Sequence, residues 1–276
     1  MALWTYFGLA RGRASSGWPR ADAQSVGQND VHGLPELGAQ PCAQGCQACV
    51  EVCPTDALRS VLDGSDGAVA TTRNVTLDYG RCIGCRRCLE VCPTQTLQPG
   101  KHWDLATRMR EDLLVAPAGP AAALEQGLAE RVARRFRHSL HIRHVDAGSC
   151  NGCESELQAL FNPFYNLHRL GIFFTASPRA ADLLLVTGTL TEPMREPLRA
   201  AWEAMPEPKW VMATGACAIS GGPAREGYAG GSGLGGVVPV DVFVPGCPPT
   251  PAAIMQGLLL LLDRSPRHLR GGIYHE

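Results

Sequence analysis

A chain of 276 residues accommodates one large domain or two modest ones, and its formal net charge of −1 gives no overall basic surface for nucleic acid. The longest apolar run, 252–262, is interrupted by Gln256 and is too short to span a bilayer. Eight of the twelve cysteines lie in two short runs, which is more typical of metal sites than of disulfides. This cysteine usage predicts a reducing, cytoplasmic compartment.

Residues 1–35 precede the first cysteine run. An apolar stretch containing aromatic residues, Leu3–Leu9, is followed by Arg11 and Arg13. The stretch has neither the charged start nor the cleavage site of a signal peptide. Such a segment can lie in a membrane interface or contact a partner, or it can pack on the domain that follows. The sequence leaves both alternatives open.

Residues 36–99 contain an internal repeat with a period of 39 residues, in which CQACVEVCPT starts at Cys46 and CRRCLEVCPT starts at Cys85. Counted from Cys82, the second copy has the C-x2-C-x2-C-x3-C-P spacing of bacterial two-cluster ferredoxins, in which the fourth cysteine binds the other cluster. The repeat therefore predicts an α+β ferredoxin domain with two [4Fe–4S] clusters. The predicted ligands are Cys42, Cys46, Cys49 and Cys92 for one cluster, and Cys82, Cys85, Cys88 and Cys53 for the other.

The first copy of the repeat departs from the ferredoxin spacing by one residue. Three residues separate Cys42 from Cys46, and we expect the turn at Gly45 to absorb the insertion. Zinc is an alternative metal for these thiol ligands, but structural zinc sites normally use two distant pairs of ligands rather than four cysteines in one run. Between the copies, residues 68–72 and 74–78 are predicted to be short strands.

Residues 100–138 contain no cysteine and are predicted to form a helical linker, with helices over Trp103–Val115 and Ala121–His138. The second helix carries four arginines, Arg131, Arg134, Arg135 and Arg137. They form either a basic docking face for an acidic partner or lipid head groups, or an ordinary solvated helix face.

Residues 139–276 alternate strands with helices, which predicts a doubly wound, flavodoxin-like α/β domain with a parallel sheet. Strands are expected over 140–148, 181–188, 209–217 and 240–247, and helices after Cys153, over Met194–Met205 and from Pro251 to about Leu262. Leu157, Leu160, Phe161 and Phe164 are expected to share one face of the first helix. Thr250 is the expected N-cap of the last helix.

Four further cysteines are predicted to meet at one edge of this sheet. Cys150, Cys217 and Cys247 each follow a predicted strand, and Cys153 opens the helix after the first. Because functional sites gather at the carboxyl edge of open parallel sheets, these thiols are expected to converge. Four thiolates suit an iron–sulfur cube or zinc, and the neighbouring ferredoxin motif favours a third [4Fe–4S] cluster. Alternatively, Cys217 is a small core residue.

The segment 231–236 formally matches the G-x-G-x-x-G pattern of dinucleotide-binding loops. A dinucleotide-binding loop follows a strand and opens a helix, whereas this segment leads into a predicted strand. We therefore interpret it as a flexible loop and do not expect it to bind NAD.

Several motifs resemble the small subunit of membrane-bound, energy-converting [NiFe] hydrogenases of the formate hydrogenlyase type, and the related complex I subunit that carries the cluster nearest the quinone. They are HVDAGSCNGCESEL at 144–157, ADLLLVTG at 181–188, PEPKWV at 206–211 and VPVDVFVPGCPPTP at 238–251. The first hundred residues resemble the separate two-cluster ferredoxin subunit of those complexes. The complex I relatives have adjacent cysteines where this chain has Cys150 and Cys153, which favours the hydrogenase side.

The resemblance implies a fused electron-transfer subunit of an oxidoreductase complex, with three [4Fe–4S] clusters and no catalytic residues of its own. The third cluster would lie beside the [NiFe] or quinone site of a large subunit. The expected partners are that large subunit, membrane subunits and an external electron donor, at the cytoplasmic face of the inner membrane. A quinone-reducing complex I-like subunit and a free-standing soluble polyferredoxin are the alternatives. Glu154 and Glu156 would either handle protons or contact the large subunit, or simply favour a helix N-terminus.

Overall fold

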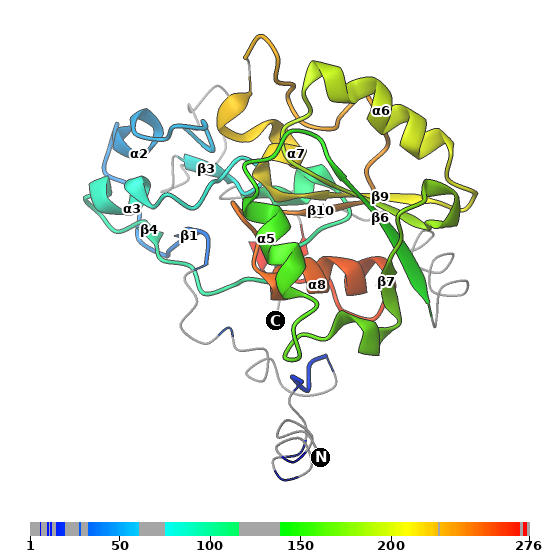
Figure 1. Ribbon diagram of the computed structural model, residues 1–276. Coiled ribbons are helices and arrows are strands. Elements are labelled where there is room, and N and C mark those ends of the chain that lie inside the picture. Colours follow the sequence, from blue (N-terminus) through cyan, green and yellow to red (C-terminus); the bar gives the residue numbers. More distant parts are fainter. Residues whose placement is uncertain are drawn as a thin grey trace.

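The computed structural model describes residues 6, 10, 12, 15–19, 28, 33–60, 75–115, 139–225, 227–270 and 273–274. Most of the N-terminal apolar stretch, the predicted strand at 68–72 and the arginine-rich helix at 121–138 lie outside the described residues. Figure 1 shows a small cysteine-rich part, which contains α2 and α3, beside a larger part built on a sheet. No helix in the described part is both long enough and apolar enough to cross a membrane.

The ferredoxin-like part consists of two similar halves. Each half places a short helix just after a cysteine-bearing loop and then a short strand; the helices are α2 (Ala48–Glu51) and α3 (Arg87–Val91). The strands are β1 (Glu36–Leu37), β2 (Leu58–Ser60), β3 (Val75–Asp78) and β4 (Leu97–Gln98). β1 pairs with β4, and β2 pairs with β3, all antiparallel. The strand expected at 74–78 is therefore confirmed as β3.

The helix expected over Trp103–Val115 is wrong. This stretch instead contains an extended bridge between Thr107 and Phe243, the 3-10 turn η2 (Arg110–Leu113) and the strand β5 (Leu114–Val115), which pairs with β3. Leu105 and Ala106 are both buried but belong to two different hydrophobic cores. An extended backbone sends successive side chains to opposite sides, so this conformation, unlike a helix, lets adjacent residues fill both cores.

The larger part has a five-stranded parallel sheet in the order β10-β9-β8-β6-β7, which confirms the doubly wound α/β prediction. Its strands are β6 (Leu140–Asp146), β7 (Ile172–Phe174), β8 (Leu183–Thr187), β9 (Trp210–Thr214) and β10 (Val242–Val244). Every residue of β8 and β9 is buried, as expected for central strands covered on both faces. The sequence patterns missed β7, a three-residue edge strand. The 231–236 loop precedes β10.

Helices cover both faces of the sheet. The helices are α5 (Gly152–Ala159), α6 (Glu192–Glu203), α7 (Gly215–Ser220) and α8 (Pro251–Leu261). α5 and α8 pack on one face, and α6 and α7 on the other (Figure 1). Shorter elements complete the chain: η3 (Leu167–Leu170), η4 (Pro178–Ala180), η5 (Gly222–Ala224), β11 (Leu269–Arg270) and β12 (Ile273–Tyr274).

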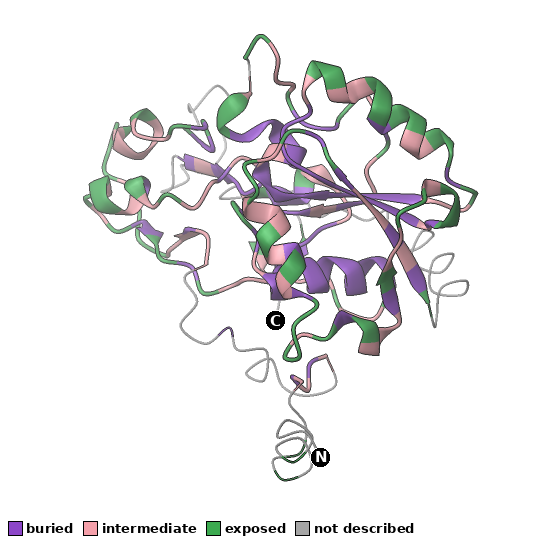
Figure 2. Ribbon diagram, in the orientation of Figure 1, coloured by how far each residue is buried: buried purple, intermediate pink, exposed green. Residues whose placement is uncertain are grey.

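All eleven residues of α8 are buried, whereas much of α6 is exposed (Figure 2). The side-chain oxygen of Thr250 accepts a hydrogen bond from the Ala253 N–H at 3.3 Å, which confirms the predicted N-cap. The prediction that four apolar residues share one face of α5 is only partly right, because the helix ends at Ala159. Leu157 and Leu160 are buried, but Phe161 is 47% and Phe164 is 37% exposed.

Candidate cluster-binding sites

One pocket of the ferredoxin-like part is lined by Cys42, Cys46, Cys49 and Cys92, together with Val75, Thr94, Thr96 and other residues. Three of these thiols come from the loop and helix of the first repeat, and Cys92 comes from the end of the second. Gly45 turns this loop with a φ of 69°, close to the 66° of Gly84 in the other repeat. The extra residue before Gly45 therefore leaves the turn intact, as expected from glycine's freedom to adopt positive φ.

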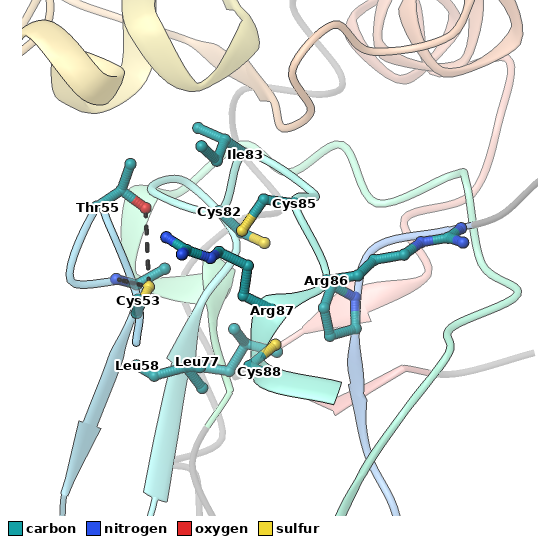
Figure 3. Close-up of a pocket in the computed structure, with 12 residues that line it drawn as sticks. Cys53, Thr55, Leu58, Leu77, Cys82, Ile83, Cys85, Arg86, Arg87 and Cys88 are labelled. Atoms are coloured by element: carbon teal, nitrogen blue, oxygen red, sulfur yellow. Dashed lines mark hydrogen bonds between the residues drawn. The ribbon is translucent and has the colours of Figure 1, made fainter. Parts of the chain in front are cut away.

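The second pocket is lined by Cys53, Cys82, Cys85 and Cys88, together with Leu58, Leu77, Ile83, Arg87 and others (Figure 3). Cys53 comes from the first repeat and the other three thiols from the second. Backbone N–H groups point at two of the sulfurs: Ala57 donates to Cys53 at 3.2 Å, and Gly84 donates to Cys82 at 3.5 Å. The two pockets thus contain the two crossed sets of cysteines that the repeat predicts.

Burial makes negative charge unfavourable in both pockets. It raises the pKa of Cys49 and of Cys88 to about 11 and that of Cys82 to about 12, with neighbouring cysteines adding to the shift. At Cys92, burial also acts upward, but hydrogen bonds from Leu97 and Thr94 outweigh it and bring the pKa of this thiol below its ordinary value. Since metal binding requires thiolates, these pockets need positive charge to hold them.

The third group of thiols forms at the carboxyl edge of the parallel sheet. Cys150 lies between β6 and α5, Cys153 in α5, Cys217 in α7 and Cys247 after β10. Burial raises the pKa of Cys153, and charge repulsion from Glu154 and the other three thiols raises it further. The four thiols are therefore close enough to interact electrostatically, although they are spread over 98 residues of sequence. Cys217 is half-buried rather than part of either core, which argues against a purely core-filling role.

Glycines allow the backbone to approach these thiols closely. A Cβ at Gly215 would lie 2.8 Å from the Cys153 Sγ, and a Cβ at Gly222 would lie 2.7 Å from the Cys217 Sγ. The Ala216 N–H donates to the Gly246 oxygen at 2.9 Å and so ties the start of α7 to the loop before Cys247. The sequence patterns did not identify these glycines, because their role depends on contacts between distant segments.

Glu154 follows Cys153 directly, in the first turn of α5. Within the described part of the chain, neither of its buried carboxylate oxygens has a hydrogen-bond partner, and Oε1 is 3.8 Å from the His144 Nε2. His144 Nε2 is in turn hydrogen-bonded to the Thr187 Oγ1 at 2.8 Å. Glu154 is recognisable from the sequence as the residue after Cys153, whereas no sequence motif points to His144. Glu156 is half-buried, and burial raises its pKa.

The donor chemistry fits iron–sulfur cubes better than zinc. All twelve cysteines are free thiols, and two sets of four surround pockets rather than a single point. A tetrahedral zinc site would draw its four ligands around one atom, whereas a cube needs four thiolates spread around its faces.

The second ferredoxin pocket lies next to the third thiol group. The buried Ser220 Oγ, at the end of α7, donates a hydrogen bond to the Gly80 carbonyl at 2.9 Å and lies 3.0 Å from the Ala216 carbonyl. Gly80 precedes Cys82 by two residues, and α7 contains Cys217. This hydrogen bond therefore joins the segment just before Cys82 to the helix that contains Cys217.

Comparison with known proteins assigns both parts to families. Residues 41–96 match the 4Fe-4S dicluster domain, so the first part is an iron–sulfur domain. Residues 150–261 match the family described as NADH ubiquinone oxidoreductase, 20 Kd subunit. This second match contains all four cysteines of the third group, since it begins at Cys150 and extends beyond Cys247.

Formate hydrogenlyase subunit 7 of Escherichia coli is 44% identical over 140 residues, which cover 50% of this chain and 55% of the relative. This chain thus spans about half the length of that relative. The probable membrane-bound hydrogenase subunit mbhJ of Pyrococcus furiosus is 40% identical over 150 residues, which cover 54% of this chain and 89% of the relative. A chain of the archaeal membrane-bound sulfane sulfur reductase is 37% identical over 45% of this chain and 69% of its own, with a TM-score of 0.41. The chain therefore belongs to the family of the 20 Kd subunit of NADH ubiquinone oxidoreductase and its hydrogenase-subunit relatives, joined here to an N-terminal 4Fe-4S dicluster domain.

Proposed function

We propose that this chain is an electron-transfer subunit with three [4Fe–4S] clusters in a membrane-associated [NiFe] hydrogenase-type complex. The proposed ligand sets are Cys42, Cys46, Cys49 and Cys92; Cys53, Cys82, Cys85 and Cys88; and Cys150, Cys153, Cys217 and Cys247. The observation that carries the proposal is the Ser220–Gly80 contact, which sets the second ferredoxin pocket beside the third thiol group. It supports a relay in which electrons pass between the two parts of one chain.

The residues of the chain supply the ligands and control their surroundings. When bound, each cube accepts and releases one electron at a time. The thiolates hold it, the Ala57 and Gly84 N–H groups donate to ligand sulfurs, and apolar residues such as Leu58 and Leu77 exclude water. N–H groups aimed at thiolates favour the added negative charge of the reduced state.

The relay order follows from the same contact. The third group would exchange electrons with the second ferredoxin pocket, and that pocket with the Cys42 pocket. Cys150 and Cys247 are exposed, which suits a site that a large partner subunit covers. An external electron donor would then meet the Cys42 end. This order gives each part of the fusion a distinct role: one contacts the active-site subunit and the other the donor.

The domain organisation we propose has an N-terminal contact segment at 1–35, a two-cluster ferredoxin domain at 36–99, a linker at 100–138 and the hydrogenase small-subunit-like domain at 139–276. Two relatives are named as subunits of formate hydrogenlyase and of a membrane-bound hydrogenase. By analogy, membrane subunits would hold this chain peripherally at the cytoplasmic face of the inner membrane. Glu154 and Glu156 would lie at the contact with the large subunit.

A quinone-reducing complex I-like role is the second candidate, because the matching family is described by a subunit of NADH ubiquinone oxidoreductase. The Cys150-x-x-Cys153 spacing favours the hydrogenase role, since the complex I relatives have adjacent cysteines at this point. The two candidates share the three clusters and differ in the reaction at the large subunit.

The test begins with iron and acid-labile sulfide analysis and EPR of the anaerobically purified complex. We expect about twelve irons and twelve sulfides per chain, from three cubes. Cys217→Ser should remove one EPR signal and leave the two ferredoxin signals. Reduction of the clusters by H2 would then support the hydrogenase role, and reduction of a quinone without response to H2 would support the second candidate. Stoichiometric zinc without sulfide would refute both.

A further inference from the structure

The two ferredoxin pockets differ in charge at one pair of equivalent positions. Between the second and third cysteines of each repeat, the first copy has Gln47 and Ala48, whereas the second has Arg86 and Arg87. Ala48 is the first residue of α2 and Arg87 the first residue of α3, so the two positions are equivalent in the fold as well. One turn further on, both helices carry a glutamate, which does not distinguish them.

Of the two arginines, Arg87 is the one directed at the thiols. Both line the second pocket. Figure 3 shows the Arg87 side chain extending toward Cys53 and Cys82, whereas the Arg86 side chain extends away from the four thiols. Within the described residues, neither arginine is in salt-bridge contact with a carboxylate, so the Arg87 charge is not neutralised locally.

Burial of the thiols and the positive charge of Arg87 have opposite effects on the reduction potential of a cluster in this pocket. Cys82 is 8% and Cys88 is 7% exposed, Cys53 is half-buried and Cys85 is exposed, whereas all four thiols of the other pocket are half-buried. Each added electron makes a four-thiolate site more negative, so burial disfavours its reduced state. A cation beside the thiolates favours the reduced state by direct Coulomb attraction. Arg87 therefore offsets the burial of Cys82 and Cys88, and the first pocket has no arginine at the matching position.

We propose that Arg87 raises the reduction potential of the cluster held by Cys53, Cys82, Cys85 and Cys88. This proposal rests on the ligand sets given under the proposed function. Because this pocket lies beside the third thiol group, its potential determines whether electrons can pass between the two parts of the chain. Arg87 keeps this middle site of the relay reducible.

The test is an EPR-monitored redox titration of the anaerobically purified complex with Arg87→Gln. Removing the positive charge of Arg87 should lower the reduced-to-oxidised ratio of this cluster about tenfold at a fixed potential. This corresponds to a decrease of about 59 mV in the reduction potential of a one-electron couple. Arg87→Lys should retain most of the wild-type potential, because it keeps the charge. Arg86→Gln is the matched control and should shift the same signal much less, because its side chain points away.

The reciprocal substitution, Ala48→Arg, places a cation at the equivalent position of the first pocket. It should raise the potential of the other ferredoxin signal and leave the Arg87-sensitive signal unchanged. The Arg87→Gln shift should also shrink at high salt, since Arg87 is exposed and its charge is partly screened.

Iron analysis separates failure of this proposal from failure of the proposed function. Absence of both ferredoxin EPR signals from the wild-type protein would refute the ligand sets themselves. Full iron content in Arg87→Gln with an unchanged potential would overturn the role of Arg87 alone. Equal shifts in Arg86→Gln and Arg87→Gln would do the same, because they would show a general effect of surface charge rather than of the side chain directed at the thiols.

Discussion

Gly215 offers a direct test of the third cluster, because its substitution by alanine should remove that cluster and spare the other two. Gly215 has a φ of 89°, and an added Cβ would lie 2.8 Å from the Cys153 Sγ, where ordinary contact begins at 3.4 Å. The sulfur or the start of α7 would have to move by roughly 0.6 Å. This exceeds the ~0.5 Å within which the ligands of a functional site must be held. The left-handed backbone costs an alanine a further ~1 kcal/mol. Both effects disturb the segment that carries Cys217.

The assay is iron and sulfide analysis with EPR of the anaerobically purified Gly215→Ala complex. Iron should fall from about twelve to about eight per chain, with the two ferredoxin signals unchanged. Two matched controls separate the clash from backbone strain. Gly236 has a φ of 84° with nothing within 4 Å of an added Cβ, and Gly235 has neither a positive φ nor a close neighbour. Alanine at either position should retain all the iron.

Full iron and an unchanged EPR spectrum in Gly215→Ala would refute this reasoning, because the clash would then be relieved without cost to the site. Equal iron loss in Gly236→Ala would refute it differently, because backbone strain alone would then explain the result.

Three other substitutions test the fold around these sites. Cys92→Ser should abolish the EPR signal of the cluster held by the first repeat, and loss confined to the signal of the Cys82 pocket would contradict the crossed ligand sets. Gln256→Leu should lower the thermal midpoint, because the buried Gln256 Oε1 accepts from the Ala106 N–H at 3.2 Å and an unsatisfied buried N–H costs about 1–3 kcal/mol; an unchanged midpoint would show that water replaces it. Thr250→Ala should cost about 1 kcal/mol in a denaturant titration through loss of the α8 N-cap, whereas Thr250→Ser should cost less.

The sequence determined the parts of this protein whose rules are local. Cysteine spacing predicted which thiols share a pocket, because three of them lie close together in one repeat and the fourth is the cysteine before the proline of the other repeat. Apolar runs predicted β8 and β9, and Thr250 with Pro251 predicted the start of α8. The carboxyl-edge rule also predicted that Cys150, Cys153, Cys217 and Cys247 converge, since parallel strands bring their ends together whatever their separation in sequence.

Only the tertiary structure decided features that depend on two distant surfaces at once. Residues 103–109 have a helix-compatible composition, yet they are extended because Leu105 and Ala106 must fill different cores. Gln256 interrupts an apolar run without explanation in the sequence, and its role becomes clear only from the Ala106 N–H that it satisfies. Arg86 and Arg87 are adjacent and identical in type, and only the folded loop directs Arg87 toward the thiols. In each case the role of the residue depends on how the folded chain surrounds it, and a local sequence pattern does not contain that information.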